Sequence, residues 1–209
     1  MDIGETHRFL KRVDIEPLVE RIRTVDEALW DSEEAMRQVM TGVRPTRAIY
    51  IWYTNALYMP HDRPIVQADV SRRAGWDWFS PTVLPIIEEV QTFYPPGGVV
   101  VSCQIAKLLP GGHITRHQDI APLLRASHRI HLPLITWPEV TFFIDDMPFT
   151  FEAGHAFELN NQRFHEVRHA GTQDRYHLIL DILPAGYDPA PMAAVLRSDV
   201  ARLVPRMKD

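Results

Sequence analysis

The chain has 209 residues, of which 45% are hydrophobic and 23% are charged, and its net charge is −5. These values are typical of a soluble globular protein and exclude disordered, collagen-like and disulfide-scaffold classes. The slightly acidic balance gives no electrostatic footprint for nucleic acid, although a local pair of arginines would still suit a small anion. We therefore expect one domain whose core is large enough to be stable without disulfide bonds.

The single cysteine, Cys103, rules out an intramolecular disulfide and a cysteine-based zinc cluster. Its apolar neighbours predict that it packs as a small hydrophobic residue. The charged N-terminus has no apolar segment of the kind found in secretory signals. The longest uncharged stretch, Ala48–Pro60, is too short to cross a bilayer. We therefore expect a cytoplasmic protein with no membrane partner.

The first half of the chain predicts helices around one strand. Apolar residues recur every three or four positions from Ile15 to about Met40, which predicts an amphipathic helix there, and Asp31 and Ser32 are candidate caps for a second segment through Val39. Ala48–Tyr53 is rich in β-branched and aromatic residues and predicts a strand. Trp76, Trp78 and Phe79 are assigned to a loop before a helix capped by Ser80 and started by Pro81. The residues expected to face inward on that helix are Leu84, Ile87, Val90 and Tyr94.

From Val99 onward, short apolar runs alternate with turn residues, which predicts a mainly β fold, an antiparallel sandwich or jelly roll with helices at both ends. The expected strands are Val99–Leu109, His113–His117, His128–Ile135, Val140–Ile144, Phe149–Phe151, Ala156–Leu159, Phe164–His169 and Arg175–Leu183. A last helix is expected over Met192–Val204. In this single domain, residues 1–98 would support the core and supply walls of a substrate pocket, 99–184 would form the catalytic core, and 185–209 a helical tail. The wall candidates are Trp76–Phe79 and Asn55–Asp69.

Eight of the ten histidines lie between His113 and His177, and neutral imidazole is the commonest protein metal ligand. His117 and Asp119 are two residues apart on an extended segment, so their side chains point to the same side. With His165 they would form the two-histidine, one-carboxylate triad of non-haem Fe(II) oxygenases. Such pairs also arise by chance, and each histidine taken singly is better explained as a surface or core imidazole.

Cationic side chains near the same strands suggest an anionic ligand. Arg175 opens an apolar strand, where a charge needs a partner, and its guanidinium suits a carboxylate. Arg129 and His131 share one face of another strand and would add a second cationic, donor-rich pair. Two anion-binding points and a metal fit a dicarboxylate such as 2-oxoglutarate. The alternative is that Arg175 forms an internal salt bridge with Asp174, Glu166 or Asp181.

Four segments together resemble the aspartyl/asparaginyl β-hydroxylase family of Fe(II)- and 2-oxoglutarate-dependent oxygenases. They are Leu109–Asp119 (LPGGHITRHQD), Arg129–Thr136 (RIHLPLIT), Phe151–His169 (FEAGHAFELNNQRFHEVRH) and Asp174–Pro184 (DRYHLILDILP). The resemblance implies a double-stranded β-helix with flanking helices. It also implies that His117, Asp119 and His165 bind iron, that Arg175 holds the distal carboxylate of 2-oxoglutarate, and that Arg129 and His131 lie near its metal-bound end.

Asp119 makes the chain similar to the bacterial members of this family, because the animal members lack an acidic ligand at that position. The resemblance implies hydroxylation of an unactivated C–H bond of an amino-acid-like or peptidyl substrate, with O2 consumed and succinate and CO2 released. A serine that the animal members use on the co-substrate is replaced at about Ala106, and Gln104 is a candidate substitute.

Two other functions stay open on the residues alone. One is a metal-binding, cupin-like isomerase or lyase, which would share the histidines but has no need of the arginines. The other is a non-catalytic domain that binds 2-oxoglutarate or metal. The sequence leaves open the substrate, the stereochemistry, the oligomeric state and whether iron binding requires Asp119.

Overall fold

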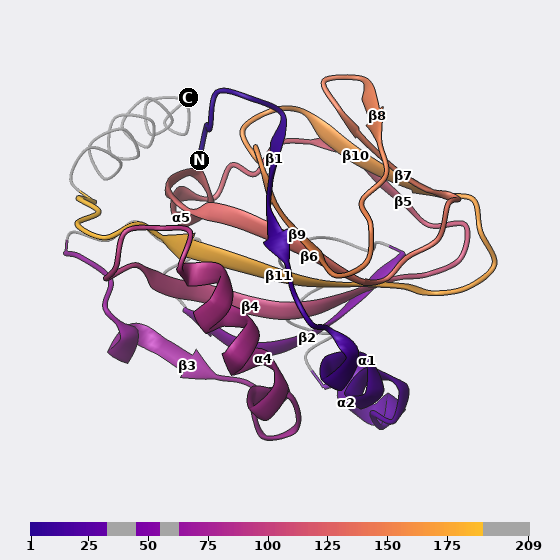
Figure 1. The fold of residues 1–209 in the computed structure, drawn as a ribbon, viewed down its shortest axis with the longest axis horizontal. Coiled ribbons are helices and arrows are strands. Elements are labelled where there is room, and N and C mark those ends of the chain that lie inside the picture. The colour runs from indigo at the N-terminus through magenta and orange to yellow at the C-terminus, as the bar shows by residue number, and fades with distance from the viewer. Residues whose placement is uncertain (33–44, 55–62, 190–209) are drawn as a thin grey trace, which may run out of the picture.

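The computed structural model describes residues 1–32, 45–54 and 63–189. It is a sandwich of two β-sheets with helices over one outer face (Figure 1). In chain order its elements are β1 (His7–Arg12), α1 (Glu16–Arg23), α2 (Glu27–Asp31), β2 (Thr46–Thr54), the 3-10 helix η2 (Gln67–Asp69), β3 (Val70–Arg72), α4 (Trp76–Gln91), β4 (Val99–Leu108), β5 (His113–His117), α5 (Pro122–Ala126), β6 (His128–Ile135), β7 (Val140–Ile144), β8 (Met147–Phe149), β9 (His155–Leu159), β10 (His165–His169) and β11 (Arg175–Leu183).

Both sheets are antiparallel, which confirms the mainly β jelly roll. The larger sheet has the strand order β1-β9-β6-β11-β4-β2-β3, and the smaller sheet has the order β5-β10-β7-β8. Each strand predicted after Val99 has a counterpart, although β8 begins two residues earlier than expected, at Met147. The expected strand at Ala48–Tyr53 is the centre of β2. β1 was not predicted from the sequence, and it pairs with β9 at one edge of the larger sheet.

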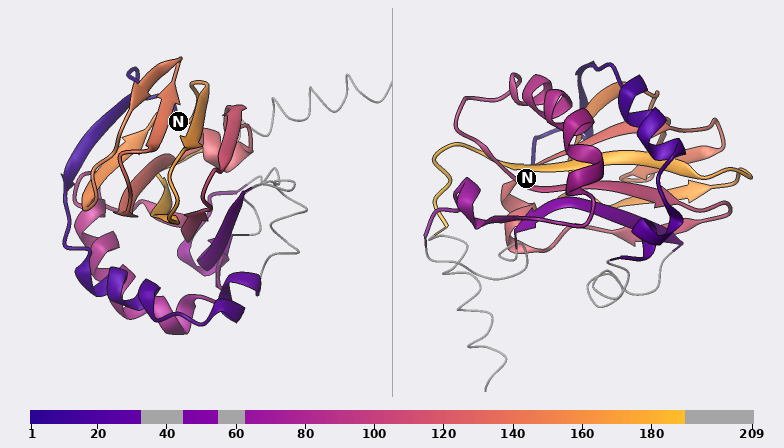
Figure 2. Two further views of the ribbon diagram at one scale, coloured as in Figure 1. Left: turned by 90° about the vertical axis from the view of Figure 1, so that its right-hand side faces the viewer. Right: turned by 90° about the horizontal axis from the view of Figure 1, so that it is seen from below.

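The larger sheet is the middle layer of the molecule. On one face, α1 and α4 pack against it around residues such as Ile22, Phe79 and Ile130 (Figure 2, left). On its other face it meets the smaller sheet, with Phe142, Ile144 and other apolar residues packed between the two. Because α1, α2 and α4 lie on the outer face of the larger sheet, the inner faces of the two sheets are left to build a site.

The prediction of a helix from Ile15 to Met40 is wrong, because the first helix ends at Arg23 and a second one follows. α1 ends there with Thr24 as its C-cap, and Asp26 then caps α2 by accepting a hydrogen bond from the backbone N–H of Ala28 (2.8 Å). A side-chain oxygen at an N-cap satisfies an otherwise unpaired amide, so a new helix starts at Asp26. The segment expected from Asp31 to Val39 falls mostly outside the described residues.

The assignment of Trp76–Phe79 to a loop is also wrong, since α4 begins at Trp76. Its N-cap is Gly75, where a Cβ atom would lie 2.6 Å from Ile49 Cγ2, so only glycine allows this close approach to β2. Pro81 and Pro85 lie inside the helix on its solvent-facing side, where water can bond the carbonyls that they leave unpaired. Ile87 and Val90 are buried as expected, but Leu84 is 38% exposed.

Three other expectations have different outcomes. Cys103 is fully buried among apolar residues, as predicted. No helix in the described part of the chain is long and apolar enough to cross a membrane. The helix expected over Met192–Val204 lies outside the described residues.

Candidate active site

The residues predicted to bind metal and co-substrate all line one cavity of about 470 Å³. The smaller sheet contributes His117 at the end of β5 and His165 at the start of β10, while the larger sheet contributes β6 and β11. Those two strands carry the cationic and donor groups of the cavity, which are Arg129, His131 and Arg175. The double-layered architecture therefore brings the two predicted groups of residues together.

Strand pairing places the two histidines side by side. β5 and β10 are antiparallel with His117 opposite His165, and the centroids of the two rings are 4.3 Å apart. Asp119 follows two residues after β5, where its backbone N–H donates to the carbonyl of Asn161 (3.0 Å). One ligand atom from each of the three side chains lies within 4.8 Å of the others. Two imidazoles and a carboxylate gathered in this way suit a non-haem iron and leave further coordination positions open.

Backbone carbonyls fix the tautomers of both histidines. Nδ1 of His117 is 2.7 Å from the carbonyl oxygen of Thr115, and Nδ1 of His165 is 2.9 Å from that of Arg163. Because a carbonyl only accepts, each Nδ1 donates a proton, and the lone pair of the neutral ring is therefore on Nε2. Burial lowers the pKa of His165, which favours its neutral ring. The neutral form of either ring would thus present Nε2 to a metal.

Asp119 is tied to the larger sheet through Arg129. Nε of Arg129 lies 3.2 Å from Oδ2 of Asp119, and its Nη1 donates to Oδ1 of Asp181 (2.9 Å). Asp181 is 1% exposed and lies opposite Arg129 in the pairing of β11 with β6. Burial raises the pKa of Asp181, and the positive charge of Arg129 offsets only part of that rise. Arg129 thus links a candidate metal ligand to the central strand β11.

Arg175 is buried without a carboxylate partner in the described part of the chain. Its side chain is 2% exposed, its Nε has no hydrogen-bond partner, and its Cζ lies 5.3 Å from the ring centre of Phe142. Burial lowers the pKa of the guanidinium to about 9. The internal salt bridge considered as an alternative is not formed. Asp174 instead contacts Lys107 (3.7 Å), Glu166 pairs with Arg168 (2.6 Å) and Asp181 pairs with Arg129.

His131 differs from the expectation in its charge. It is buried, and burial together with Arg129 and Arg175 lowers its pKa well below the usual range, so the ring is neutral rather than cationic. It contributes a polar ring nitrogen to the cavity and not a second positive charge.

Several supporting residues were missed by sequence reasoning. Asp181 holds Arg129, and the side chain of Gln162 donates to the backbone carbonyl of Asp119 (3.0 Å). The run Asn160-Asn161-Gln162, three residues before His165, was a signal for a polar loop beside the histidine. Nothing in the sequence showed that this loop would bond to Asp119.

The sequence profile of the family described as Aspartyl/Asparaginyl beta-hydroxylase matches residues 22–184. The chain belongs to this family. The hydroxylase accordingly depends on Fe(II), 2-oxoglutarate and O2.

Two solved structures share the fold of the hydroxylase. An oxidoreductase of the 2OG-Fe(II) oxygenase family from Burkholderia pseudomallei is 16% identical, with a TM-score of 0.54 over 85% of this chain and 84% of its own. The nickel complex of the non-heme monooxygenase ThoJ is 13% identical, with a TM-score of 0.52 over 86% of this chain and 74% of its own. At such identities the likeness concerns the fold alone. No curated protein matches the sequence.

The N-terminal half of the hydroxylase lines the cavity through β2. Among the described residues before Val99, those that line it are Thr46, Arg47, Ala48 and Tyr50. Trp76 instead packs at a tilt against Trp52 (5.7 Å between ring centroids) on the helical side of the larger sheet. Part of the other candidate wall, Asn55–Asp69, lies outside the described residues, and its described part does not line the cavity. Gln104 and Ala106 both do.

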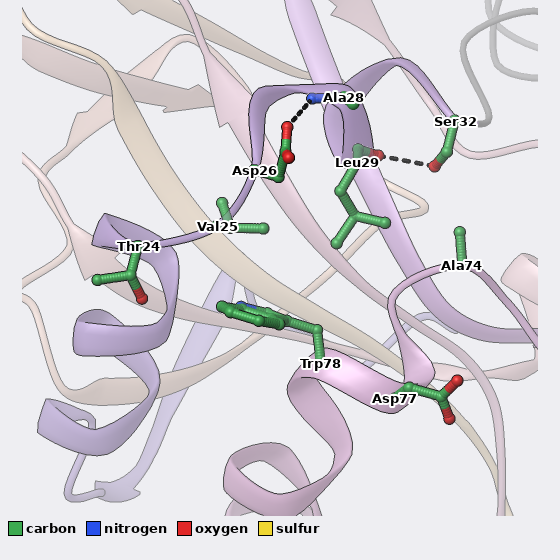
Figure 3. Close-up of a pocket in the computed structure, with 9 residues that line it drawn as sticks. All are labelled: Thr24, Val25, Asp26, Ala28, Leu29, Ser32, Ala74, Asp77 and Trp78. Carbon is green, nitrogen blue, oxygen red and sulfur yellow. Dashed lines mark hydrogen bonds between the residues drawn. The ribbon is translucent and has the colours of Figure 1, made fainter.

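A second hollow, on the surface of the hydroxylase, has a different character. It lies between the α1–α2 connection and the start of α4, around the indole of Trp78 (Figure 3). Its polar groups are already used locally, since Asp26 bonds to Ala28 and the Ser32 hydroxyl donates to the carbonyl of Leu29 (2.7 Å). None of its described lining residues is a histidine or a cationic side chain. The cavity between the sheets is therefore the better candidate for an active site.

Proposed function

We propose that the hydroxylase oxidises an unactivated C–H bond of an amino-acid-like or peptidyl substrate, releasing succinate and CO2. In this proposal His117, Asp119 and His165 bind Fe(II), Arg175 binds the distal carboxylate of 2-oxoglutarate, and Arg129 and His131 lie near its metal-bound end. The observation that carries the proposal is that a buried guanidinium, which has no carboxylate partner among the described residues, lines the same cavity as the three candidate ligands.

The donor set fits the metal. Both imidazoles present Nε2 lone pairs because their Nδ1 protons are held by carbonyls. The carboxylate adds one negative charge and is itself positioned by Arg129 (3.2 Å). A second group positioning a ligand carboxylate in this way is typical of protein metal sites.

The charges fit the co-substrate as well. Arg47 also lines the cavity, but Glu27 and Asp31 already neutralise its charge. The other charged groups of the described cavity and its wall are Asp119 and Asp181, which are negative, and Arg129 and Arg175, which are positive. These four charges cancel. Fe(II) and the dianion of 2-oxoglutarate also cancel, so that binding both leaves the cavity neutral. Either one alone would leave two uncompensated charges in a buried place, which is unfavourable. We therefore expect metal and co-substrate to strengthen each other's binding.

The side chains divide the remaining work by position. When bound, the metal and co-substrate supply the oxidising power. Phe142, Val167 and Ile179 are buried apolar wall residues that exclude water from the inner part of the cavity. Ile120 lines the same cavity but is 76% exposed, so the outer part, where a substrate can enter, lies beside Asp119. The chain thus orients the co-substrate inside and leaves the substrate side open.

Anaerobic titration of the Fe(II)-loaded protein with 2-oxoglutarate tests the proposal, because the chelate has a weak visible charge-transfer band. We expect the band in the wild type and its loss in Arg175→Met at the same concentrations, with iron still bound. Arg168→Met is the matched control, since that arginine is on β10 with a side chain that is 60% exposed. If iron binds to the wild type and no band forms, the metal-only isomerase or lyase becomes the better explanation.

A further inference from the structure

The inner face of β11 carries one polar residue that the proposed function does not use. Side chains two apart on a strand share a face, so Arg175, His177, Ile179 and Asp181 all point toward the smaller sheet. Arg175 and Ile179 line the cavity and Asp181 holds Arg129. His177 is fully buried and is not part of the cavity wall. A buried imidazole in this row needs an explanation.

His177 contacts His131, which does line the cavity. The two Nδ1 atoms are 3.4 Å apart, and the ring planes cross at 78°. Phe142 stacks on the ring of His177, with 13° between the planes and 5.5 Å between the centroids. The aromatic contact holds the imidazole of His177 in the orientation that points its Nδ1 at His131.

Both rings are neutral, since burial and the nearby Arg175 lower the pKa values of both histidines well below the usual range. Each ring therefore carries one proton, and only one of the two facing Nδ1 atoms can hold it. If His131 holds it, its Nε2 is a bare acceptor in the cavity. If His177 holds it, Nε2 of His131 carries an N–H instead. The contact thus has two states that present opposite polarities to a ligand.

The unpaired atoms favour the second state. In the described part of the chain, Nε2 of His131 and Nε2 of His177 are both buried without a hydrogen-bond partner. The oxygens of 2-oxoglutarate only accept, so a donor at Nε2 of His131 gains a partner when the co-substrate binds. In the same state Nε2 of His177 has an unpaired lone pair and not an unpaired N–H. A buried acceptor without a partner costs less than a buried donor without one.

We propose that His177 is a positioning residue for the co-substrate, donating from its Nδ1 to Nδ1 of His131 and so holding the proton of His131 on Nε2, directed into the cavity. This inference rests on the proposed function. His131 then offers 2-oxoglutarate a fixed donor that needs no reorganisation on binding, and its direction is set by a ring that never touches the ligand.

Nitrogen NMR of the protein with ¹⁵N-labelled histidine rings, loaded with Zn(II) and 2-oxoglutarate, reads the tautomer directly. The inference predicts a protonated Nε2 on His131 in the wild type. A protonated Nδ1 on His131 overturns it without the need for any variant.

Three substitutions extend the test by titration of the Zn(II)-loaded protein with 2-oxoglutarate. His177→Phe keeps a ring against Phe142 but removes the donor, so its dissociation constant should rise about tenfold, as for other indirect partners. His177→Asn places an amide N–H near the position of Nδ1 and should restore most of the affinity. His177→Gln places its amide near Nε2 instead and should behave like His177→Phe. Wild-type affinity in His177→Phe would overturn the inference.

The same titrations separate this inference from the proposed function. If the wild type does not bind 2-oxoglutarate, or if Arg175→Met binds it as well as the wild type does, the proposed function fails. If Arg175→Met loses the ligand while His131 shows the opposite tautomer, only the role of His177 fails. Zinc affinity should be equal in all the His177 variants, because His177 contacts none of the three candidate metal ligands in the described structure.

Discussion

Each face of the larger sheet holds a cluster of polar side chains around a buried charged group, and the two clusters differ in how completely they are hydrogen-bonded. The Glu158 cluster (Arg8, Tyr94, His128 and Glu158) lies on the helical side. One oxygen of Glu158 accepts from Arg8 Nε (2.8 Å) and from the Tyr94 hydroxyl (2.9 Å), and the other contacts Nδ1 of His128 (2.6 Å). Both carboxylate oxygens are satisfied within the protein, although the side chain is fully buried.

The cavity cluster (Arg129, His131, Arg175 and His177) lies on the opposite face. Within the described residues, buried nitrogens of Arg175, His131 and His177 have no hydrogen-bond partner. Native proteins leave few buried polar groups unpaired, and several together indicate something that completes them. The comparison teaches that burial and charge alone do not mark a site, because the Glu158 cluster has both. The missing partners mark it, so changes in one cluster should affect stability and changes in the other should affect binding.

The largest expected effect follows from removing a candidate metal ligand. His165→Ala should lower metal affinity by more than about a hundredfold, beyond the loss seen for indirect partners of metal ligands, and abolish turnover. Metal titration calorimetry and succinate release measure the two effects. His113→Ala is the control, because that histidine is on β5 of the same sheet with a side chain 48% exposed. Unchanged succinate release in His165→Ala would remove the triad from consideration.

The next effect separates binding from stability within one residue. Arg175 is charged and buried without a carboxylate partner among the described residues, which is costly in the ligand-free protein. Arg175→Met keeps the unbranched apolar stem of the side chain and removes the charged guanidinium. The free energy of unfolding of the ligand-free protein should therefore rise by about 1 to 4 kcal/mol, as when other buried ions are replaced by apolar residues. Urea unfolding measures the change, and a loss of stability would show that the guanidinium is structural.

Glu158→Gln should show the reverse pattern. The amide keeps the shape of the side chain but leaves Arg8 and His128 facing a neutral group, one end of which now donates. Because the Arg8 side chain is 42% exposed, water stabilises part of the charge left behind, and the substitution should cost about 1 to 3 kcal/mol of unfolding free energy. The affinity for 2-oxoglutarate should not change, because the Glu158 cluster lies on the other face of the sheet. A weakened affinity at a temperature where the variant is fully folded would contradict the separation of the two clusters.

The sequence predicted one cluster better than the other, for a physical reason. β5, β6, β10 and β11 show clear apolar patterns broken by turn residues, and their polar residues stand out against that background. β1 has only Leu10 buried and is otherwise charged or exposed at the sheet edge, so its sequence HRFLKR carries no strand pattern. Charged edges are common because they discourage pairing with other chains. Arg8 therefore could not be connected to Glu158, 150 residues away.

The residues that line the cavity could be predicted as a group, but the contacts between them could not. Residue types, two-residue spacings and the family resemblance were enough to group His117, Asp119, Arg129 and the others. Arg175 and Asp181 are both on β11, and six residues of extended strand, about 20 Å, keep them apart. The pairing of Asp181 with Arg129 depends on the register of β6 against β11, which places the two residues opposite each other. Register is not written in either strand alone, and a shift of one residue would turn every side chain to the other face. For the same reason the contact between His131 and His177 could not be predicted from the sequence.

The smallest expected effect concerns acid. Burial alone would raise the pKa of Glu158, but hydrogen bonds from His128, Arg8 and Tyr94 outweigh it and hold the pKa below its usual value. As the pH falls, the unfolded chain takes up its proton first, so the stabilisation is complete above about pH 4.3 and is lost as the pH falls through the lower native pKa. Asp181, which lies beside the cavity cluster, has a raised pKa instead. Its contribution to stability is therefore lost as the pH rises, and not as the pH falls.

Urea unfolding of the wild type and Glu158→Gln over a pH series isolates the contribution of Glu158 to the unfolding free energy, because both proteins keep Asp181 and every other carboxylate. The difference in unfolding free energy between them should be constant near neutral pH and narrow as the solution becomes more acidic, since protonated Glu158 no longer differs in charge from glutamine. A gap that stays constant to the acid limit of folding would mean that the carboxylate has its ordinary pKa in the native protein. The Glu158 cluster would then owe its stability to packing, and the contrast with the cavity would lose its electrostatic basis.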